Sequence, residues 1–306
     1  RVNATLAPIT SKGNTLTIRK FSKTPWTITS FLKNRTLDYT AAAMIWQAMQ
    51  YELSILVVGG TGSGKTSFMN VIAGFFPPNQ RIISIEDTRE LKLPETLHWV
   101  PMQSRLPNPE GKGEITMLDC MINALRMRPD RIIVGEVRRE KELEVLFEAL
   151  HTGHSVYSTF HASNVNEAIA RLANPPISLP KQLMASLDLI VVQHRNRREG
   201  TRRTFQIAEI DDLGNPRIIM QHNNMQDKMI QVSMAQKIMN TLMLYTGMSQ
   251  QQINSELQEK LLVLKWLVSK DITDINKVGM IISNYYTEKQ HLLDLVRKNQ
   301  DYETVK

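Results

Sequence analysis

Apolar residues along the chain change their spacing in a way that predicts alternating strands and helices. From Asp38 to Ala173, short continuously apolar runs alternate with segments in which apolar residues recur every three or four positions. This pattern predicts strands at 53–58, 81–85, 131–135 and 155–160 and helices at 38–50, 65–75, 116–127, 140–151 and 165–173. Continuously apolar strands are usually covered on both faces, so we expect an α/β fold with a mainly parallel sheet between helices.

The two ends of the chain depart from this pattern. Residues 1–36 combine short strand-like runs with Pro, Gly and Ser, which indicates the end of an N-terminal domain and a linker through Pro25. After about residue 224 the strand signal disappears and the apolar spacing becomes helical. We therefore expect three parts, which are the N-terminal remnant at 1–36, an α/β core at 37–224 and a helical C-terminal subdomain at 225–306.

Composition is typical of a globular protein. The chain has 306 residues and is 42% hydrophobic, which is enough for two domains with buried cores. No stretch reaches the roughly 18 apolar residues of a membrane span, and the start has neither Met nor a signal-peptide core, so we expect a cytoplasmic fragment of a longer protein. The single cysteine, Cys120, excludes an internal disulfide and a zinc site built from cysteines.

Part of the net charge of +7 comes from one segment, HRNRREGTRR at 194–203, which holds five arginines. Strand-like runs flank it and Gly200 lies in the turn. Such an arginine cluster is either a solvated hairpin tip or a surface that grips nucleic acid or anionic lipid. We favour the hairpin tip and expect no nucleic-acid partner, because no aromatic residue lies between the arginines to stack on bases.

The segment GGTGSGKT at 59–66, called the glycine loop below, fits the phosphate-binding pattern G-x-x-x-x-G-K-[ST] between an apolar strand and a helix. Its glycines let successive backbone N–H groups turn inward on phosphate oxygens at the helix N-terminus. Lys65 can reach the β- and γ-phosphates, and the Thr66 hydroxyl can ligate Mg²⁺. The sequence thus predicts that ATP and Mg²⁺ bind at Gly59, Gly60, Thr61, Gly62, Ser63, Gly64, Lys65, Thr66 and Ser67.

Acidic residues end two of the predicted strands. Glu86 and Glu136 each follow a continuously apolar run, and ligands of open α/β sheets bind at the carboxyl ends of strands. We expect both carboxylates near the glycine loop, on strands that neighbour its own. His161 also follows a strand, where it either senses a γ-phosphate or bonds to local backbone.

Four segments in this order resemble the type II/IV secretion ATPase superfamily, the hexameric motors of type IV pili, type II secretion and the archaellum. The segments are GGTGSGKT, ISIEDTREL, EGKGEITMLDCMINALRMRPDRIIVGEVR and TGHSVYSTFHASN. The resemblance extends to RVNATL and TIRKF near the start and to IISNYY near the end, which resembles the archaeal branch. It implies a RecA-like P-loop core with a helical C-terminal subdomain.

The resemblance also implies roles for single residues. Glu86 would polarise the attacking water, Glu136 would hold Mg²⁺ together with Thr66, and His161 would be the histidine of the family's His box. Hexamers of this kind close each site with arginines from the neighbouring subunit or the N-terminal domain. The candidates for that role here are Arg19, Arg126 and Arg138.

The function implied by the resemblance is ATP hydrolysis by a homohexamer at the inner face of the cell membrane. It would drive secretion or filament assembly through a membrane-embedded platform protein. Two alternatives stay open at this point. The chain could be a nucleic-acid translocase that uses the arginine cluster, or a nucleotide-gated scaffold without catalysis.

Overall fold

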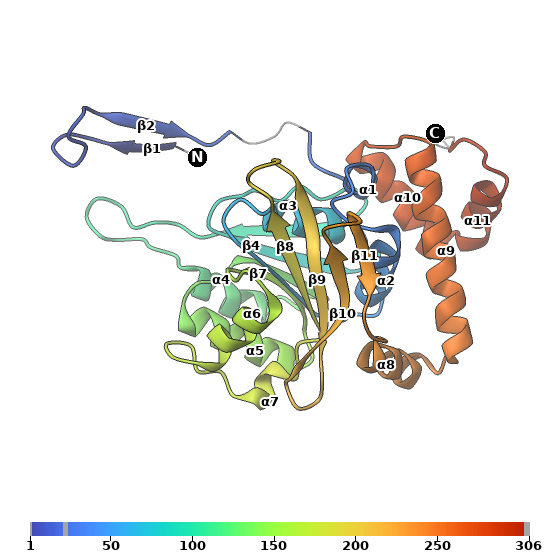
Figure 1. Ribbon diagram of the computed structural model, residues 1–306. Coiled ribbons are helices and arrows are strands. Elements are labelled where there is room, and N and C mark those ends of the chain that lie inside the picture. The colour runs from blue at the N-terminus through green and yellow to red at the C-terminus, as the bar shows by residue number, and fades with distance from the viewer. Residues whose placement is uncertain (1, 21–23, 303–306) are drawn as a thin grey trace.

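A nine-stranded mixed sheet organises the chain, and the computed structural model describes residues 2–20 and 24–302 (Figure 1). The strands of this sheet are β3 (Ile55–Gly59), β4 (Arg81–Glu86), β5 (His98–Gln103), β6 (Arg131–Glu136), β7 (Ser155–Phe160), β8 (Leu189–Arg195), β9 (Arg202–Ile210), β10 (Pro216–Asn223) and β11 (Lys228–Gln231). Their order across the sheet is β11-β10-β9-β8-β3-β7-β6-β4-β5. The strands from β8 to β5 pair in parallel, and β9, β10 and β11 extend the sheet antiparallel. The predicted mainly parallel sheet is therefore confirmed.

Helices cover both faces of the sheet. The helices are α1 (Ile28–Lys33), α2 (Tyr39–Gln50), α3 (Lys65–Ala73), α4 (Met117–Ala124), α5 (Glu140–His151), α6 (Val165–Ala173), α7 (Lys181–Met184), α8 (Gln236–Thr246), α9 (Gln250–Ser269), α10 (Ile275–Thr287) and α11 (Lys289–Arg297). In β3, Ile55 and Val57 join the apolar cluster under α2 and α3, whereas Leu56 and Val58 join the cluster under α4, α5 and α6. Because successive side chains of a strand face opposite sides, a strand covered on both faces has to be continuously apolar.

Local capping explains where several helices begin. The Asp38 side chain accepts a hydrogen bond from the backbone N–H of Thr40 and caps α2. Thr116 and Asp119 form a reciprocal capping box at the start of α4. These short-range bonds satisfy N–H groups that have no partner inside the helix, so both starts can be predicted from sequence.

The structure differs from the sequence prediction at the margins of the sheet. The pattern predicts no strand after about residue 224, yet β11 pairs with β10 beyond that point. Neither β5 nor β10 is predicted either. The strands β5 and β11 are the two edges of the sheet, where backbone pairing to one neighbour is enough and apolar patterning is weak. Pro101 in β5 is tolerated for the same reason.

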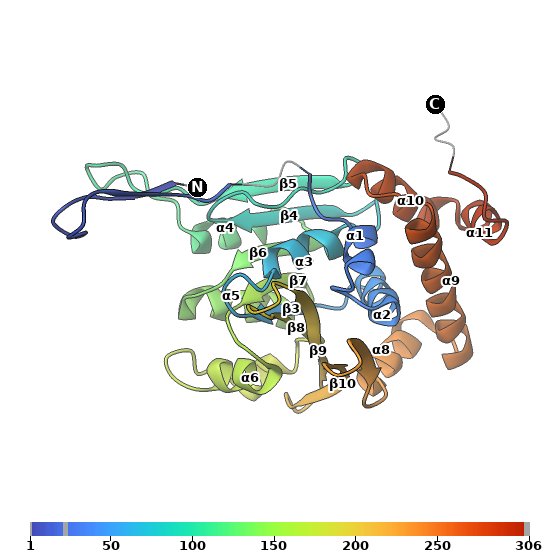
Figure 2. The ribbon, with the colours of Figure 1, turned by 45° about the horizontal axis from the view of Figure 1, so that its top comes forward.

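Residues 2–20 and 24–36 also hold more structure than short strands and a linker. The strands β1 (Val2–Thr5) and β2 (Thr15–Ile18) pair as a largely exposed hairpin that stands away from the body (Figures 1 and 2). Helix α1 is not predicted, and its Ile28, Phe31 and Leu32 are buried in the core under α2 and α3. Arg1 and Phe21, at the ends of the quoted RVNATL and TIRKF, lie outside the described residues.

The described residues contain no helix that is both long enough and apolar enough to span a bilayer. The C-terminal helices α9, α10 and α11 pack beside α1 and α2 at one end of the sheet (Figure 2). Cys120 is a buried free thiol in α4.

Candidate active site

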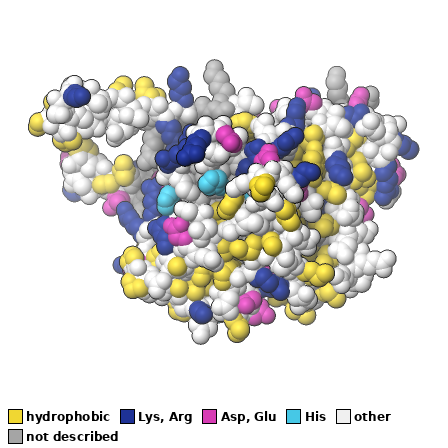
Figure 3. Space-filling view, viewed as in Figure 1, with side chains coloured by type: hydrophobic (Ala, Val, Ile, Leu, Met, Phe, Trp, Pro, Cys, Tyr) yellow, Lys and Arg dark blue, Asp and Glu magenta, His cyan; other side chains and the backbone are white. Residues whose placement is uncertain are grey.

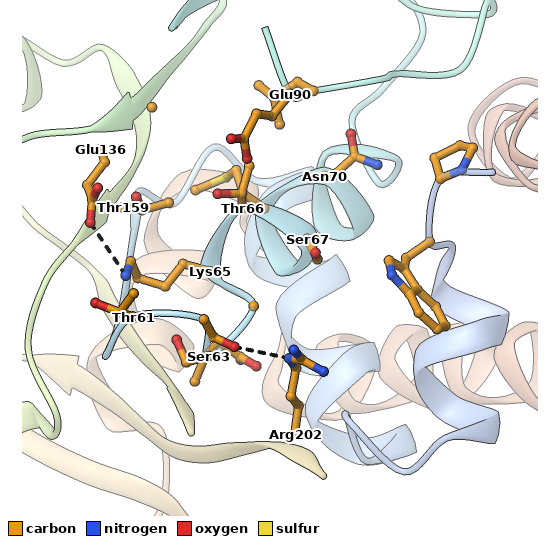
Figure 4. Close-up of a pocket in the computed structure, with 18 of the residues that line it drawn as sticks. Thr61, Ser63, Lys65, Thr66, Ser67, Asn70, Glu90, Glu136, Thr159 and Arg202 are labelled. Atoms are coloured by element: carbon orange, nitrogen blue, oxygen red, sulfur yellow. Dashed lines mark hydrogen bonds and ion pairs between the residues drawn. The ribbon is translucent and has the colours of Figure 1, made fainter. Parts of the chain in front are cut away.

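A cavity of about 860 Å³ opens at the carboxyl ends of the parallel strands. This volume lies in the range of small-molecule sites, roughly 300–1,000 Å³. Its wall is formed by the glycine loop, the start of α3, the ends of β4 and β6, the hairpin between β8 and β9, and the segment around α1. Segments that are far apart in the sequence therefore meet at one site, part of which is drawn in Figure 4.

Glycine is required at several positions of the glycine loop. Gly62 and Gly64 have φ angles of 75° and 96°, which are in the left-handed region that side chains disfavour. A Cβ atom at position 59 would collide with the Ser63 hydroxyl and with the backbone oxygen of Gln193. The loop conformation that the sequence predicts is thus imposed both by backbone angles and by close packing.

Lys65 folds back over the glycine loop. Its Nζ donates hydrogen bonds to the backbone oxygens of Gly59 and Gly60, at 2.8 Å and 3.4 Å. The same ammonium lies 3.5 Å from Oε1 of Glu136 (Figure 4). Burial lowers the pKa of Lys65, although the Glu136 carboxylate opposes that shift. The loop therefore holds a cation at its centre, close to where the phosphates of a nucleotide are expected.

Glu136 ends β6 and is paired with two cations. Besides Lys65, its carboxylate accepts hydrogen bonds from Arg138, one of them at 3.0 Å from Nε. Burial would raise the pKa of Glu136, but the bonds and charges of Arg138 and Lys65 outweigh it and hold the pKa below its usual range. The carboxylate is consequently ionised at neutral pH, as a metal ligand must be.

The residues present fit a Mg²⁺ ion bound together with a nucleotide. Mg²⁺ usually takes one or two protein ligands, with phosphate oxygens and waters completing the octahedron. The Thr66 hydroxyl at the start of α3 and the ionised Glu136 would supply such ligands. Within the described ranges, no cluster of three or more His, Cys, Asp or Glu side chains could hold a metal ion alone.

Glu86 lies in the wall of the same cavity and is only 3% exposed. Its Oε1 accepts hydrogen bonds from the backbone N–H groups of Glu90 and Leu91, at 2.8 Å and 3.0 Å. Its Oε2 is buried and has no hydrogen-bond partner among the described residues. Burial raises the pKa of this carboxyl, against the effect of the two N–H groups. One oxygen is therefore fixed by the backbone, and the other is buried at the cavity wall without a hydrogen-bond partner.

The expectation that both acids lie on strands next to β3 is wrong. The strand β7 lies between β3 and β6, and both β7 and β6 lie between β3 and β4. Glu136 still reaches Lys65 because the parallel strands end at one edge of the sheet, so their side chains converge there.

The arginine and histidine candidates fall into two groups. Arg138 and Arg19 line the cavity, and Arg19 forms an ion pair with Glu90 at 3.3 Å. His161 and Arg126 are exposed and are not part of the cavity wall. The His161 backbone oxygen accepts a hydrogen bond from Arg171.

Two residues of the arginine cluster are functional candidates that sequence reasoning missed. Arg202 donates from Nε to the Gly62 backbone oxygen at 3.1 Å (Figure 4), and Arg203 binds both Asp227 and the Asn34 backbone oxygen. Both line the cavity, so the prediction of a solvated hairpin tip is wrong for them. Arg197 and Arg198 at the tip are exposed. Figure 3 shows Lys and Arg side chains gathered on the upper part of one face of the molecule.

Comparisons with known proteins identify the family of this chain. The model of the family described as Type II/IV secretion system protein matches residues 1–270. An uncharacterized protein of Methanocaldococcus jannaschii is 35% identical over 240 residues, which cover 76% of this chain and 88% of that protein. A second uncharacterized protein of the same organism is 40% identical over 205 residues, which cover 66% of this chain and 37% of the relative.

A solved structure shows the same fold. The X-ray structure of the Legionella pneumophila ATPase DotB matches with a TM-score of 0.51 and 20% identity, over 92% of this chain and 71% of that one. The expected RecA-like core with C-terminal helices is thereby confirmed at the level of the fold. The matched region amounts to only 37% and 22% of the lengths of two of the curated relatives. The chain belongs to the type II/IV secretion system protein family.

Proposed function

We propose that this chain hydrolyses ATP as a subunit of a hexameric motor for secretion or for the assembly of pilus-like filaments. The proposal depends on one observation. The glycine loop with Lys65, the ionised Glu136 and the half-paired carboxylate of Glu86 line a single cavity of nucleotide size. Family membership favours the same activity.

The side chains divide the work of binding and hydrolysis. Backbone N–H groups of the glycine loop and the Lys65 ammonium would bind the phosphates, and Thr66 and Glu136 would hold Mg²⁺. The metal, when bound, neutralises charge on the β- and γ-phosphates. Once its buried Oε2 is uncovered, Glu86 would orient a water molecule and accept its proton. The water oxygen would bond to the γ-phosphorus as the bond from that phosphorus to the β–γ bridging oxygen breaks, and ADP and phosphate would leave.

The coupling to mechanical work follows from the family. A site shared between subunits would turn the loss of the γ-phosphate into a rigid-body movement of one domain against the next. Arg19, Arg126 and Arg138 are the candidates for closing that site, and His161 is the candidate for the His-box histidine that senses the γ-phosphate. The motor would act at the inner face of the membrane, bound to a membrane-embedded platform protein.

Three variants test the catalytic assignment. We expect Lys65→Ala to weaken ADP and ATP binding, because it removes the cation from the loop. We expect Glu86→Gln to bind ATP normally but to release phosphate at least about 100-fold more slowly. Glu95→Gln, an exposed acid in the segment after β4, is the matched control and should behave as the unmodified protein. A phosphate-release rate of Glu86→Gln close to that of the control would refute the role of Glu86.

A further inference from the structure

Trp26 in the cavity wall is exposed, unlike the other three tryptophans of the chain. Trp26 lines the cavity and is 47% exposed, whereas Trp46 and Trp266 are almost fully buried and Trp99 is half-buried. The other three indoles donate hydrogen bonds to Tyr286, Gln300 and Ser84. No such bond joins the Trp26 indole to any residue in 2–20 or 24–302.

The position of Trp26 relative to the glycine loop is fixed by a chain of aromatic contacts. Its ring meets Phe31 of α1 edge to face, with centroids 6.2 Å apart. The Phe31 ring lies in turn 6.3 Å from that of Phe68, three residues after Lys65 in α3. Trp26 therefore stands beside the first turns of α3, with 47% of its surface exposed.

The segment that carries Trp26 is attached at its C-terminal side as well. Phe31 and Leu32 of α1 are buried in the core. The Thr204 backbone N–H donates to the Thr36 backbone oxygen at 2.7 Å, next to the Arg203 bond to Asn34. The segment that follows Trp26 is thus anchored to the core through α1 and to the β8–β9 hairpin through Asn34 and Thr36.

The chemistry of the cavity differs between its two ends. Lys65, Glu136 and the glycine loop form the charged end that receives phosphates. Figure 4 shows Ser67 and Asn70 further along α3 from that end. Trp26 supplies most of the exposed apolar surface of the wall along the helix, since Phe31 and Met69 also line it but are only 5% and 1% exposed. A nucleotide whose phosphates occupy the loop and whose sugar follows α3 brings its base to this apolar wall.

We infer that Trp26 stacks on the base of the bound nucleotide and gives the site a preference for purine over pyrimidine nucleotides. The inference rests on the proposed function and adds to it the residue that selects the base. An exposed indole offers a flat polarizable surface, and stacking of a base on an aromatic ring is sequence-tolerant but grows with the area of the base. A purine covers more of the ring than a pyrimidine does.

The experiment compares the affinities of three ligands, ADP, CDP and pyrophosphate, by isothermal titration calorimetry in the presence of Mg²⁺. None of the three has a γ-phosphate that could be hydrolysed. We expect Trp26→Leu to bind ADP about tenfold more weakly and CDP less affected, with pyrophosphate unchanged. Trp26→Phe should retain most of the ADP affinity because it keeps a ring. Trp99→Phe, which alters the half-buried indole of β5, is the matched control and should leave all three affinities unchanged.

Tryptophan fluorescence gives a second readout that needs no loss of affinity. ADP should quench the emission of the unmodified protein and of Trp99→Phe, but not that of Trp26→Phe, in which the remaining indoles lie away from the base.

Two outcomes would overturn the inference while leaving the proposed function intact. One is an unchanged ratio of ADP to CDP affinity in Trp26→Leu, and the other is an equal loss of ADP and pyrophosphate, which would make Trp26 a support of the loop. If the unmodified protein bound neither ADP nor pyrophosphate, the proposed function itself would fail, and the inference with it.

Discussion

Burial and backbone hydrogen bonds act on the pKa of Glu86 in opposite directions. Glu86 is nearly buried, which disfavours the charged form and raises its pKa, yet two backbone N–H groups hold one of its oxygens. The bonds fix the direction of the side chain, and burial makes its free oxygen a stronger base than a solvated carboxylate would be. This arrangement suits a group that must take a proton from water during each turnover.

The raised pKa of Glu86 predicts how hydrolysis responds to acid. A base works only when deprotonated, so phosphate release should fall on acidification at a pH above the ordinary carboxyl pKa of about 4.3. The pKa of Glu136 is lowered, so the metal ligand stays ionised and ADP binding should persist at pH values where turnover is already lost. Rates and calorimetric binding measured from pH 5 to 8 provide the check. Parallel loss of binding and turnover would contradict the assignment.

The residues that sequence could identify are those whose role depends on their neighbours along the chain. The geometry of the glycine loop depends only on its own backbone angles and on the helix that follows it. The placement of Glu86 and Glu136 depends only on the strands that they end. Trp26 and Arg202 could not be found in this way. Both approach the loop only because the sheet order places β8 beside β3 and because α1 packs on α3.

At the scale of elements, the β8–β9 hairpin supports the glycine loop. The Arg202 guanidinium binds the Gly62 oxygen from outside the loop, and the hairpin is tied to the α1 segment through Arg203. A carbonyl held on the outer side favours N–H groups that face inward, toward the phosphates. The arginine cluster thus contributes to the site through the loop backbone.

Replacing Arg202 tests this support. We expect Arg202→Met to weaken ADP binding about threefold to tenfold, since it removes one charge-assisted hydrogen bond of the loop. Arg198→Met removes an equal charge at the exposed tip of the same hairpin and serves as the control. Calorimetric titration of both variants decides the point, and equal affinities in the two would show that only the overall charge matters.

A buried lysine joins the helical subdomain to the core. Lys260 of α9 is fully buried, lies 3.4 Å from Glu256, and has the rings of Trp46 and Tyr285 within 6.0 Å and 5.0 Å of its Nζ. Burial lowers the pKa of Lys260 to about 8, although Glu256 opposes the shift. The same cluster includes Tyr51, Glu259 and Lys289. The charge therefore sits where α2, α9 and α10 meet.

The lowered pKa of Lys260 predicts a stability that depends on pH. The unfolded lysine titrates near 10.4, so above about pH 8 the unfolded chain binds more protons than the folded one, and the free energy of unfolding rises with pH. This increment is lost as the pH falls through about 8. We expect denaturant titrations at pH 8 and 9.5 to differ by about 1.5 kcal/mol in the unmodified protein and in Lys265→Met, an exposed control on the same helix. Lys260→Met should lack the difference, and a difference retained there would assign it to another group.

Patterning predicted the central elements of the fold better than its margins. The strands β3, β4 and β6 are mostly apolar on both faces, and α2 and α4 begin at side-chain caps, so local sequence specifies them. The edge strands β5 and β11 are stabilised by backbone pairing with a single neighbour, which leaves little trace in side-chain pattern. The unpredicted α1 has only six residues and is stabilised by packing against the core rather than by its own sequence.

At the scale of the whole molecule, the site candidates lie on two different surfaces. Arg138 faces the cavity from its own chain, while Arg126 and His161 are exposed outside the cavity wall. In a ring built by head-to-tail contacts, an exposed residue of one subunit can complete the site of the next. This geometry is compatible with the proposed hexamer, in which Arg126 would act on the nucleotide of a neighbour.

Mixing two inactive variants tests the arrangement directly. Lys65→Ala disables the site of its own subunit, and Arg126→Ala would disable the site of the adjacent one, so each variant alone should hydrolyse little ATP. In an equimolar mixture that exchanges subunits, about one quarter of the interfaces pair an intact loop with an intact Arg126, and a corresponding share of activity should return. Phosphate release measured before and after mixing gives the result.

If Arg126 acts within its own subunit, every interface lacks one of the two groups where it is needed, and mixing restores nothing. Arg105→Ala alters an exposed arginine outside the cavity wall and serves as the control. It should be fully active alone. Mixed with Lys65→Ala, it should give only the activity expected from its own share of the subunits.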